Sequence, residues 1–125
     1  MKINHIAIRT KDIERLRSFY TKYFGAVSGE KYHNPKKGFT SYFLSFNGDT
    51  RLELMHRPGL AENAFEVYGL AHIAISVGSK EAVDELTRTL EDDGYAIICN
   101  PRTTGDGYYE SVIADPEGNI IEITV

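Results

Sequence analysis

Four polar residues that can bind a metal interrupt four apolar, strand-like runs of the chain. A histidine, His5 or His72, stands in each of the runs "NHIAIR" and "AHIAIS", and a glutamate, Glu53 or Glu122, stands in each of the runs "RLELM" and "IIEIT". Two imidazoles and two carboxylates form a nitrogen and oxygen donor set that suits zinc, nickel, cobalt, manganese or iron(II) and leaves positions open for water. The sequence therefore predicts one divalent metal per site.

The alternation of residue types predicts that each of these four side chains lies on the face of its strand opposite the apolar core. In each run the polar residue lies on the face opposite the large aliphatic residues, as His5 lies opposite Ile6 and Ile8. A single histidine or glutamate in a strand is more often an exposed residue on a solvated face. Four of them at duplicated positions favour a partly buried site, in which a cation removes the cost of desolvating the two carboxylates.

Each half of the chain repeats one order of elements, a strand followed by an amphipathic helix and further strands. The first helix is expected between Thr10, as its N-cap, and Gly25, and the second between Ser79 and Gly94. The expected strands are 3–9, a short one around 27, 39–46 and 50–55 in the first half, and 70–77, 95–99, 108–114 and 120–125 in the second.

This duplication predicts an α+β fold of two tandem βαβββ modules that form a curved, partly open sheet around a metal-binding trough. The repeats are expected at about 1–56 and 69–125, with 57–68 joining them. The whole chain of 125 residues would make a single domain, 1–125.

Composition excludes several classes of partner. A net charge of -4 argues against nucleic acid or an anionic membrane as the main partner. No apolar run approaches the roughly 20 residues of a membrane span, and no signal sequence is apparent at the N-terminus. The single cysteine, Cys99, excludes an intrachain disulfide framework and a thiolate metal site, and it is expected to be a buried apolar residue. A cytoplasmic location is the expectation.

Three residues are candidates for binding a substrate. Arg9 shares the face of His5 and could hold a substrate carboxylate, although an ion pair with an acidic residue is equally compatible with the pattern. Arg102 and Tyr108 belong to the glycine-rich segment 100–107 and the strand after it, which could form either a lid over a substrate or a plain surface hairpin. The other histidines, His33 and His56, are expected to be surface residues with no special role.

The segments "NHIAIRT", "LAHIAISV" and "DPEGNIIEI" together resemble the vicinal-oxygen-chelate superfamily, which includes glyoxalase I, extradiol dioxygenases and bleomycin-resistance proteins. The resemblance covers the whole chain. The order of the four candidate ligands is most similar to that of glyoxalase I, which implies metal ligands at His5, Glu53, His72 and Glu122. The resemblance also implies a small-molecule substrate and a homodimer.

The function that this resemblance implies is a metal-dependent lyase or isomerase of the glyoxalase I type. Such an enzyme would act on a small 2-oxo or hemithioacetal substrate through an enediolate, with Glu122, and Glu53 across the site, moving the proton as general base and acid. By this resemblance, Arg9 matches a position that in glyoxalase I contacts the glutamyl carboxylate of glutathione. The substrate would then be an adduct of glutathione or of another thiol. Two alternatives remain: an epimerase or thiol transferase on the same metal platform, and a metal-free module that sequesters an antibiotic or another ligand.

Overall fold

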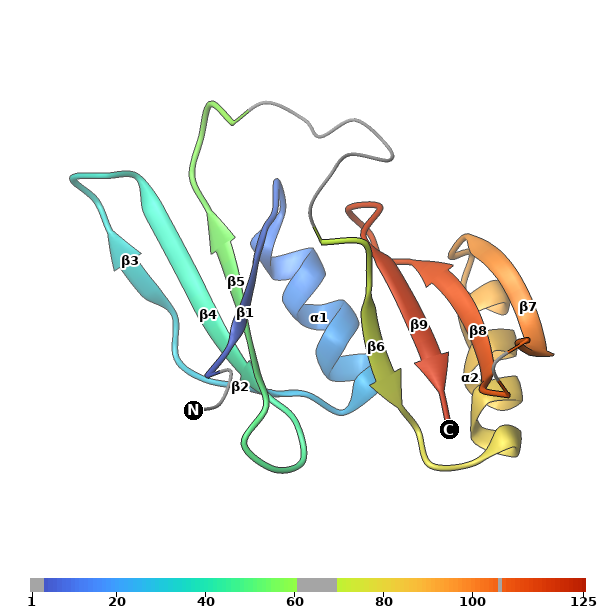
Figure 1. The fold of residues 1–125 in the computed structure, drawn as a ribbon. Coiled ribbons are helices and arrows are strands. Elements are labelled where there is room, and N and C mark those ends of the chain that lie inside the picture. The colour runs from blue at the N-terminus through green and yellow to red at the C-terminus, as the bar shows by residue number, and fades with distance from the viewer. Residues whose placement is uncertain (1–3, 61–69, 106) are drawn as a thin grey trace. The chain divides into compact units, whose positions relative to one another are not determined.

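The computed structural model describes residues 4–60, 70–105 and 107–125. The chain divides into two compact units, Met1–Glu62 and Asn63–Val125, and each is described by itself (Figure 1). The expected repeat boundaries at 56 and 69 lie on either side of this division, and the description of the chain as one domain stays a prediction.

The first unit contains one helix and one sheet. Its elements are β1 (Ile6–Arg9), α1 (Ile13–Phe24), β2 (Val27–Ser28), β3 (Tyr32–Asn34), β4 (Phe39–Ser45) and β5 (Arg51–His56). The sheet has the order β1-β5-β4-β2, and β3 also pairs with β4. β1 runs parallel to β5, whereas the other pairs are antiparallel. The first and last strands of this unit are therefore neighbours.

The second unit repeats this plan. Its elements are β6 (Ile73–Ser76), α2 (Lys80–Asp92), β7 (Ile97–Thr103), β8 (Tyr109–Ala114) and β9 (Ile120–Thr124). The sheet has the order β6-β9-β8-β7, and β6 again runs parallel to the last strand, β9. The prediction of an α+β fold with two βαβββ-like modules and open sheets is confirmed, and β3 is an additional short strand of the first unit.

The helix α1 packs its apolar stripe against its own sheet, with Leu16, Phe19 and Tyr20 fully or almost fully buried. The expected end is confirmed, since Gly25 takes the left-handed conformation with φ 62°. The expected N-cap was wrong: Asp12 caps the helix by accepting a hydrogen bond from the backbone N–H of Arg15 at 3.0 Å. Thr10 is two residues too early, because its backbone N–H donates to Met55 and extends the ladder between β1 and β5.

The helix α2 begins as expected, because the Ser79 hydroxyl accepts from the backbone N–H of Ala82 at 3.1 Å. Its buried residues include one polar side chain, Thr87, whose hydroxyl lies 2.6 Å from the hydroxyl of Ser111 on β8. This hydrogen bond satisfies both buried hydroxyls between the helix and the sheet.

Several strands differ from the expected ranges, most clearly β7 and the two strands that follow a candidate histidine, β1 and β6. The strand expected at 95–99 is β7 and continues through Pro101 to Thr103, where a loop was expected. Proline is compatible with this position because β7 is an edge strand of its sheet and the missing N–H breaks no ladder there. The strand expected at 3–9 begins at Ile6, so His5 lies directly before β1.

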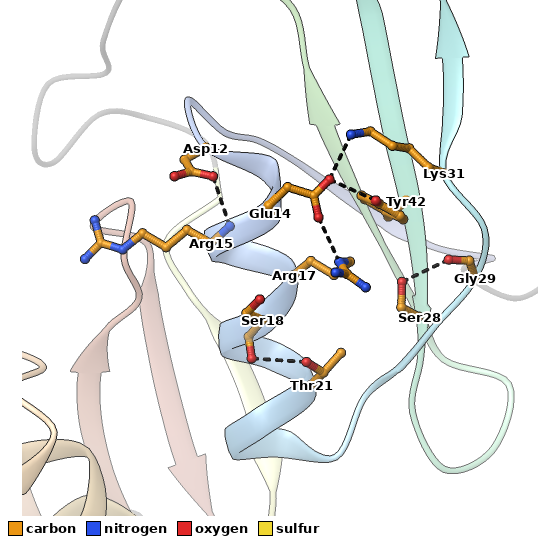
Figure 2. A network of polar contacts seen from close by, with 10 residues as sticks. All are labelled: Asp12, Glu14, Arg15, Arg17, Ser18, Thr21, Ser28, Gly29, Lys31 and Tyr42. Carbon is orange, nitrogen blue, oxygen red and sulfur yellow. Dashed lines mark hydrogen bonds and ion pairs between the residues drawn. The ribbon is translucent and has the colours of Figure 1, made fainter.

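A polar network joins α1 to the rest of the first unit (Figure 2). The Glu14 carboxylate accepts hydrogen bonds from Lys31 Nζ at 2.8 Å, from the Tyr42 hydroxyl at 2.9 Å and from Arg17 Nε at 3.2 Å. The hydrogen bond from Lys31 lowers the pKa of Glu14, against the effect of its partial burial. Burial and the bond to Glu14 raise the pKa of Tyr42.

Replacing Glu14 with Gln should lower the free energy of unfolding at pH 7 by at most about 1 kcal/mol, because the carboxylate is nearly half exposed and solvent screens its ion pairs. Folding lowers the pKa of Glu14, so its contribution is present above the ordinary value of 4.5 and is lost as the pH falls through the lower folded value. Urea denaturation at neutral and acidic pH measures this difference between wild type and variant.

The matched control is Glu30→Gln, because Glu30 is exposed on the same unit. A stability difference for Glu14→Gln that stays constant down to about pH 3 would contradict the electrostatic origin of the contribution.

Candidate functional site

His5 and Glu53 lie together in the first unit. Ala7 on β1 is opposite Glu53 on β5, and His5 precedes Ala7 by two residues, so alternation places both side chains on the same face. His5 Nε2 lies 3.7 Å from Glu53 Oε2, and the Glu53 side chain is only 15% exposed. The neighbours of Glu53 along the strand, Leu52 and Leu54, are buried on the opposite face.

His72 and Glu122 repeat this arrangement in the second unit. Ala74 on β6 is opposite Glu122 on β9, and His72 again precedes the paired alanine by two residues. His72 Nε2 lies 3.2 Å from Glu122 Oε2, and the Glu122 side chain is 22% exposed. The two units therefore hold the same pair of side chains in the same strand register.

The geometry of each pair fits two ligands of one metal ion. Two atoms bound to an ion at about 2.1 Å lie about 3.0 Å apart at a right angle and about 3.4 Å apart at the tetrahedral angle. The observed separations, 3.2 and 3.7 Å, are close to these values. Within residues 4–60, 70–105 and 107–125 no group of three or more His, Cys, Asp or Glu side chains could hold a metal. Each unit by itself therefore brings together only one His and one Glu side chain.

The neighbours of His5 fix the orientation of its ring. His5 Nδ1 lies 3.0 Å from Asn4 Oδ1, an oxygen that also accepts a hydrogen bond from Arg51. Since a carbonyl oxygen only accepts, this contact is a hydrogen bond when Nδ1 carries the proton, and Nε2, the nitrogen near Glu53, can then bind a metal ion. The Phe43 ring meets the His5 ring edge on, at 5.2 Å between centroids. A hydrogen bond from the second ring nitrogen to an oxygen is the usual support of a metal-binding histidine.

A small cationic pocket lies in the same unit. It has a volume of about 190 Å³ and is lined by Arg9, Phe39, Met55, His56, Arg57 and Leu60. Arg9 lies opposite Met55 in the pairing of β1 with β5, which places it on the face of Glu53. No described carboxylate forms an ion pair with Arg9 or Arg57. Two guanidinium groups that no described carboxylate pairs are suited to an anionic group of a ligand.

Sequence reasoning missed His56 and Arg57 as pocket residues. His56 is half-buried instead of exposed as expected, and its Nδ1 donates to the Thr10 carbonyl at 2.8 Å. The expectation that it has no special role stays a prediction. The available signal was the run "RLELMHR", in which the strand alternation that places Glu53 on one face continues to Arg57. The other candidate, His33, is exposed as expected, with Nδ1 3.0 Å from the Thr40 hydroxyl.

The remaining candidates, Arg102 and Tyr108, lie in the second unit. Arg102 is on β7, where its Nε donates to Cys99 Sγ at 3.0 Å, and Cys99 is half-buried instead of buried. Tyr108 is exposed at the end of a tight hairpin, in which Thr104 and Tyr108 exchange backbone and hydroxyl hydrogen bonds. A role of this hairpin as a lid stays a prediction, and part of it, residue 106, lies outside the described residues.

Two open-sheet modules with a matching His and Glu pair in each define a class of duplicated α+β protein. The chain belongs to the Glyoxalase/Bleomycin resistance protein/Dioxygenase superfamily, whose sequence model matches residues 2–123. Among the described residues, no helix is long and apolar enough to cross a membrane.

Curated relatives include proteins with different activities. A mitochondrial methylmalonyl-CoA epimerase of Bos taurus is 32% identical over 84 residues, which are 61% of this chain and 46% of that protein. The lactoylglutathione lyase GLX1 of Arabidopsis thaliana is 27% identical over 123 residues, 95% of this chain and 42% of that protein. The chain thus spans about half the length of these relatives.

Solved structures show the same fold. A glyoxalase I of Leishmania major, described as trypanothione-dependent, is 27% identical with a TM-score of 0.78, over 99% of this chain and 86% of that one. A glyoxalase family protein of Enterococcus faecalis has a TM-score of 0.82 at 24% identity, over 99% of this chain and 97% of that one. The second likeness concerns the fold alone.

The hydrogen bond to Asn4 predicts which nitrogen of His5 carries the proton. In the neutral, metal-free protein, long-range proton–nitrogen NMR correlations should show His5 protonated at Nδ1, and Asn4→Ala should remove this preference because the accepting oxygen is lost. Asn100→Ala, at an exposed position of the second unit, is the control and should leave the His5 signals unchanged. A His5 ring protonated mainly at Nε2 in the wild type would contradict the orientation described above.

Proposed function

We propose that the two His and Glu pairs supply ligands to one divalent metal ion, and that the protein is a metal-dependent lyase or isomerase of the glyoxalase I type. The observation that carries this proposal is the repetition of one pair in one strand register, with nitrogen to oxygen separations of 3.7 and 3.2 Å. The ligands would come either from one chain or from two copies in a homodimer. Zinc, nickel, cobalt, manganese and iron(II) all suit this donor set.

The bound ion would act as a Lewis acid towards the oxygens of a 2-oxo or hemithioacetal substrate. The chain itself supplies the proton transfer. Glu122 takes the proton from the carbon next to the carbonyl and returns it to the carbonyl carbon, while the hydroxyl proton of the hemithioacetal passes to the former carbonyl oxygen, so the product is an isomer of the substrate.

Arg9 supports a substrate that carries a carboxylate. Arg9 lies two residues along β1 from Ala7, the partner of Glu53, so its backbone is about 7 Å further along the strand. A substrate anion held by Arg9 and Arg57 can therefore extend along this face towards Glu53. A hemithioacetal meets this requirement when its thiol carries a carboxylate, as glutathione does. Arg102 and Tyr108 would contact it only if the hairpin of the second unit acts as a lid.

A second candidate is epimerisation next to a thioester carbonyl. The 32% identity to methylmalonyl-CoA epimerase over 84 residues favours it. The chemical requirement is the same, namely a base that removes a proton from carbon next to a polarised carbonyl. The two candidates differ in substrate, so assays with the hemithioacetals of methylglyoxal and with methylmalonyl-CoA distinguish them.

Replacing Glu122 with Gln should reduce turnover of the accepted substrate by about 10²-fold or more, because the amide cannot accept the proton, while the fold is retained. The measurements are initial rates with hemithioacetals of glutathione and trypanothione, and proton exchange at C2 of methylmalonyl-CoA. Circular dichroism checks the fold.

The control is Glu85→Gln, on the exposed surface of α2, which should keep wild-type rates. Unchanged turnover in Glu122→Gln would contradict the assigned base. Absence of any metal uptake by the wild type would instead support the third reading, a metal-free module that sequesters a ligand.

A further inference from the structure

A second cavity adjoins the cationic pocket of the first unit. Its volume is about 490 Å³, and Tyr32, Asn34, Lys37, Phe39 and Arg57 line it. Phe39 and Arg57 also line the smaller pocket, whereas none of the four proposed metal ligands lines either of them. The volume lies in the range of pockets that hold whole small molecules, about 300 to 1,000 Å³, and the smaller pocket does not reach it.

The β3–β4 hairpin builds this cavity. Asn34 pairs with Phe39 and Tyr32 pairs with Ser41, so Tyr32, Asn34 and Phe39 are on the same face of the hairpin. Because Ser41 pairs in turn with Met55, this is also the face that carries Glu53.

The turn between β3 and β4 positions the side chain of Lys37. The Asn34 side chain accepts a hydrogen bond from the backbone N–H of Lys37 at 3.3 Å and closes the turn. Gly38 has φ +60°, and a Cβ there would lie 3.4 Å from Pro58 Cδ. The turn therefore lies against the segment that follows β5, which brings Lys37 and Arg57 to one cavity.

The cavity combines aromatic rings with positive charge. Tyr32 is 55% exposed, and its ring centroid lies 6.1 Å from that of Phe39. No described carboxylate forms an ion pair with Lys37 or Arg57, although the chain as a whole carries a net charge of -4. Aromatic faces bind planar rings, and paired cations bind carboxylates or phosphates.

We propose that this cavity binds a planar aromatic ring that carries an anionic group, with the ring against Tyr32 and Phe39 and the anion between Lys37 and Arg57. The ring and its anion can come from an aromatic carboxylic acid or from a nucleotide. The site shares Arg57 with the proposed substrate site, but none of the four proposed metal ligands lines it, so binding does not require turnover. Glu122→Gln, which should abolish turnover, should bind the same ligands as the wild type.

The test is a titration of the full-length protein, followed by amide NMR shifts, with adenosine monophosphate, 4-hydroxybenzoate, adenosine and inorganic phosphate as probes. Adenosine monophosphate, 4-hydroxybenzoate or both should bind, with shifts concentrated at 32–39 and 57. Binding should be at least about tenfold tighter than that of adenosine or phosphate, because adenosine lacks the anion and phosphate lacks the ring. Preference for adenosine monophosphate identifies a nucleotide as the source, and preference for 4-hydroxybenzoate identifies an aromatic acid.

Two variants and two matched controls test the named residues. Lys37→Gln and Tyr32→Leu should each weaken binding of the preferred probe by about tenfold. Lys36→Gln, at the neighbouring exposed lysine, and Tyr108→Leu, at an exposed tyrosine of the second unit, should change it by less than about twofold.

Three results would overturn the proposal. The first is that neither adenosine monophosphate nor 4-hydroxybenzoate binds below about 10 mM, and the second is that the shifts are centred outside 32–39 and 57. The third is an equal loss of affinity in Lys36→Gln and Lys37→Gln, which would indicate unspecific charge attraction. Each of them can occur while the enzyme remains active, so failure here is distinct from failure of the proposed function.

Discussion

The parallel pairing of the first and last strands in each unit is the constraint on which the candidate site depends. It aligns Ala7 with Glu53 and Ala74 with Glu122, and it places a histidine two residues earlier on the same face in both cases. A shift of one residue in either pairing would turn the glutamate towards the apolar side of the sheet. The buried leucines and isoleucines beside each glutamate oppose such a shift, because it would expose them to water. Packing of the core thus fixes the chemistry of the opposite face.

The same face of the first unit also carries two guanidinium groups, those of Arg9 and Arg57. Arg9 lies two residues after Ala7 on β1, and Arg57 directly follows β5. Within the described part of the chain, no carboxylate forms an ion pair with either guanidinium group. A ligand aligned with these strands would meet the carboxylate of Glu53 at one end and the guanidinium groups of Arg9 and Arg57 at the other. This polarity suits an extended acid and supports our choice of an acidic adduct as substrate.

Local patterns in the sequence predicted the features that depend on neighbouring residues. Alternation predicted the face of each candidate ligand, and Ser79 and Gly25 were recognised from their capping chemistry. The failures have identifiable physical causes. The oxygens of both Thr10 and Asp12 can accept a capping bond, and pairing of β1 with β5 determines which of them begins the helix. The cavity beside Arg57 depends on the approach of the β3–β4 turn to a segment that follows another strand, which no local pattern reveals.

The central claim is that the two pairs bind one divalent metal through nitrogen and oxygen ligands. The most direct measurement is X-ray absorption at the metal edge of the protein purified without chelator, together with the metal content. We expect about one ion for each set of four ligands, with a first coordination shell of nitrogen and oxygen only and outer scattering from two imidazole rings. A first shell that contains sulfur, scattering from fewer than two imidazoles, or a protein that takes up no divalent ion would contradict this account.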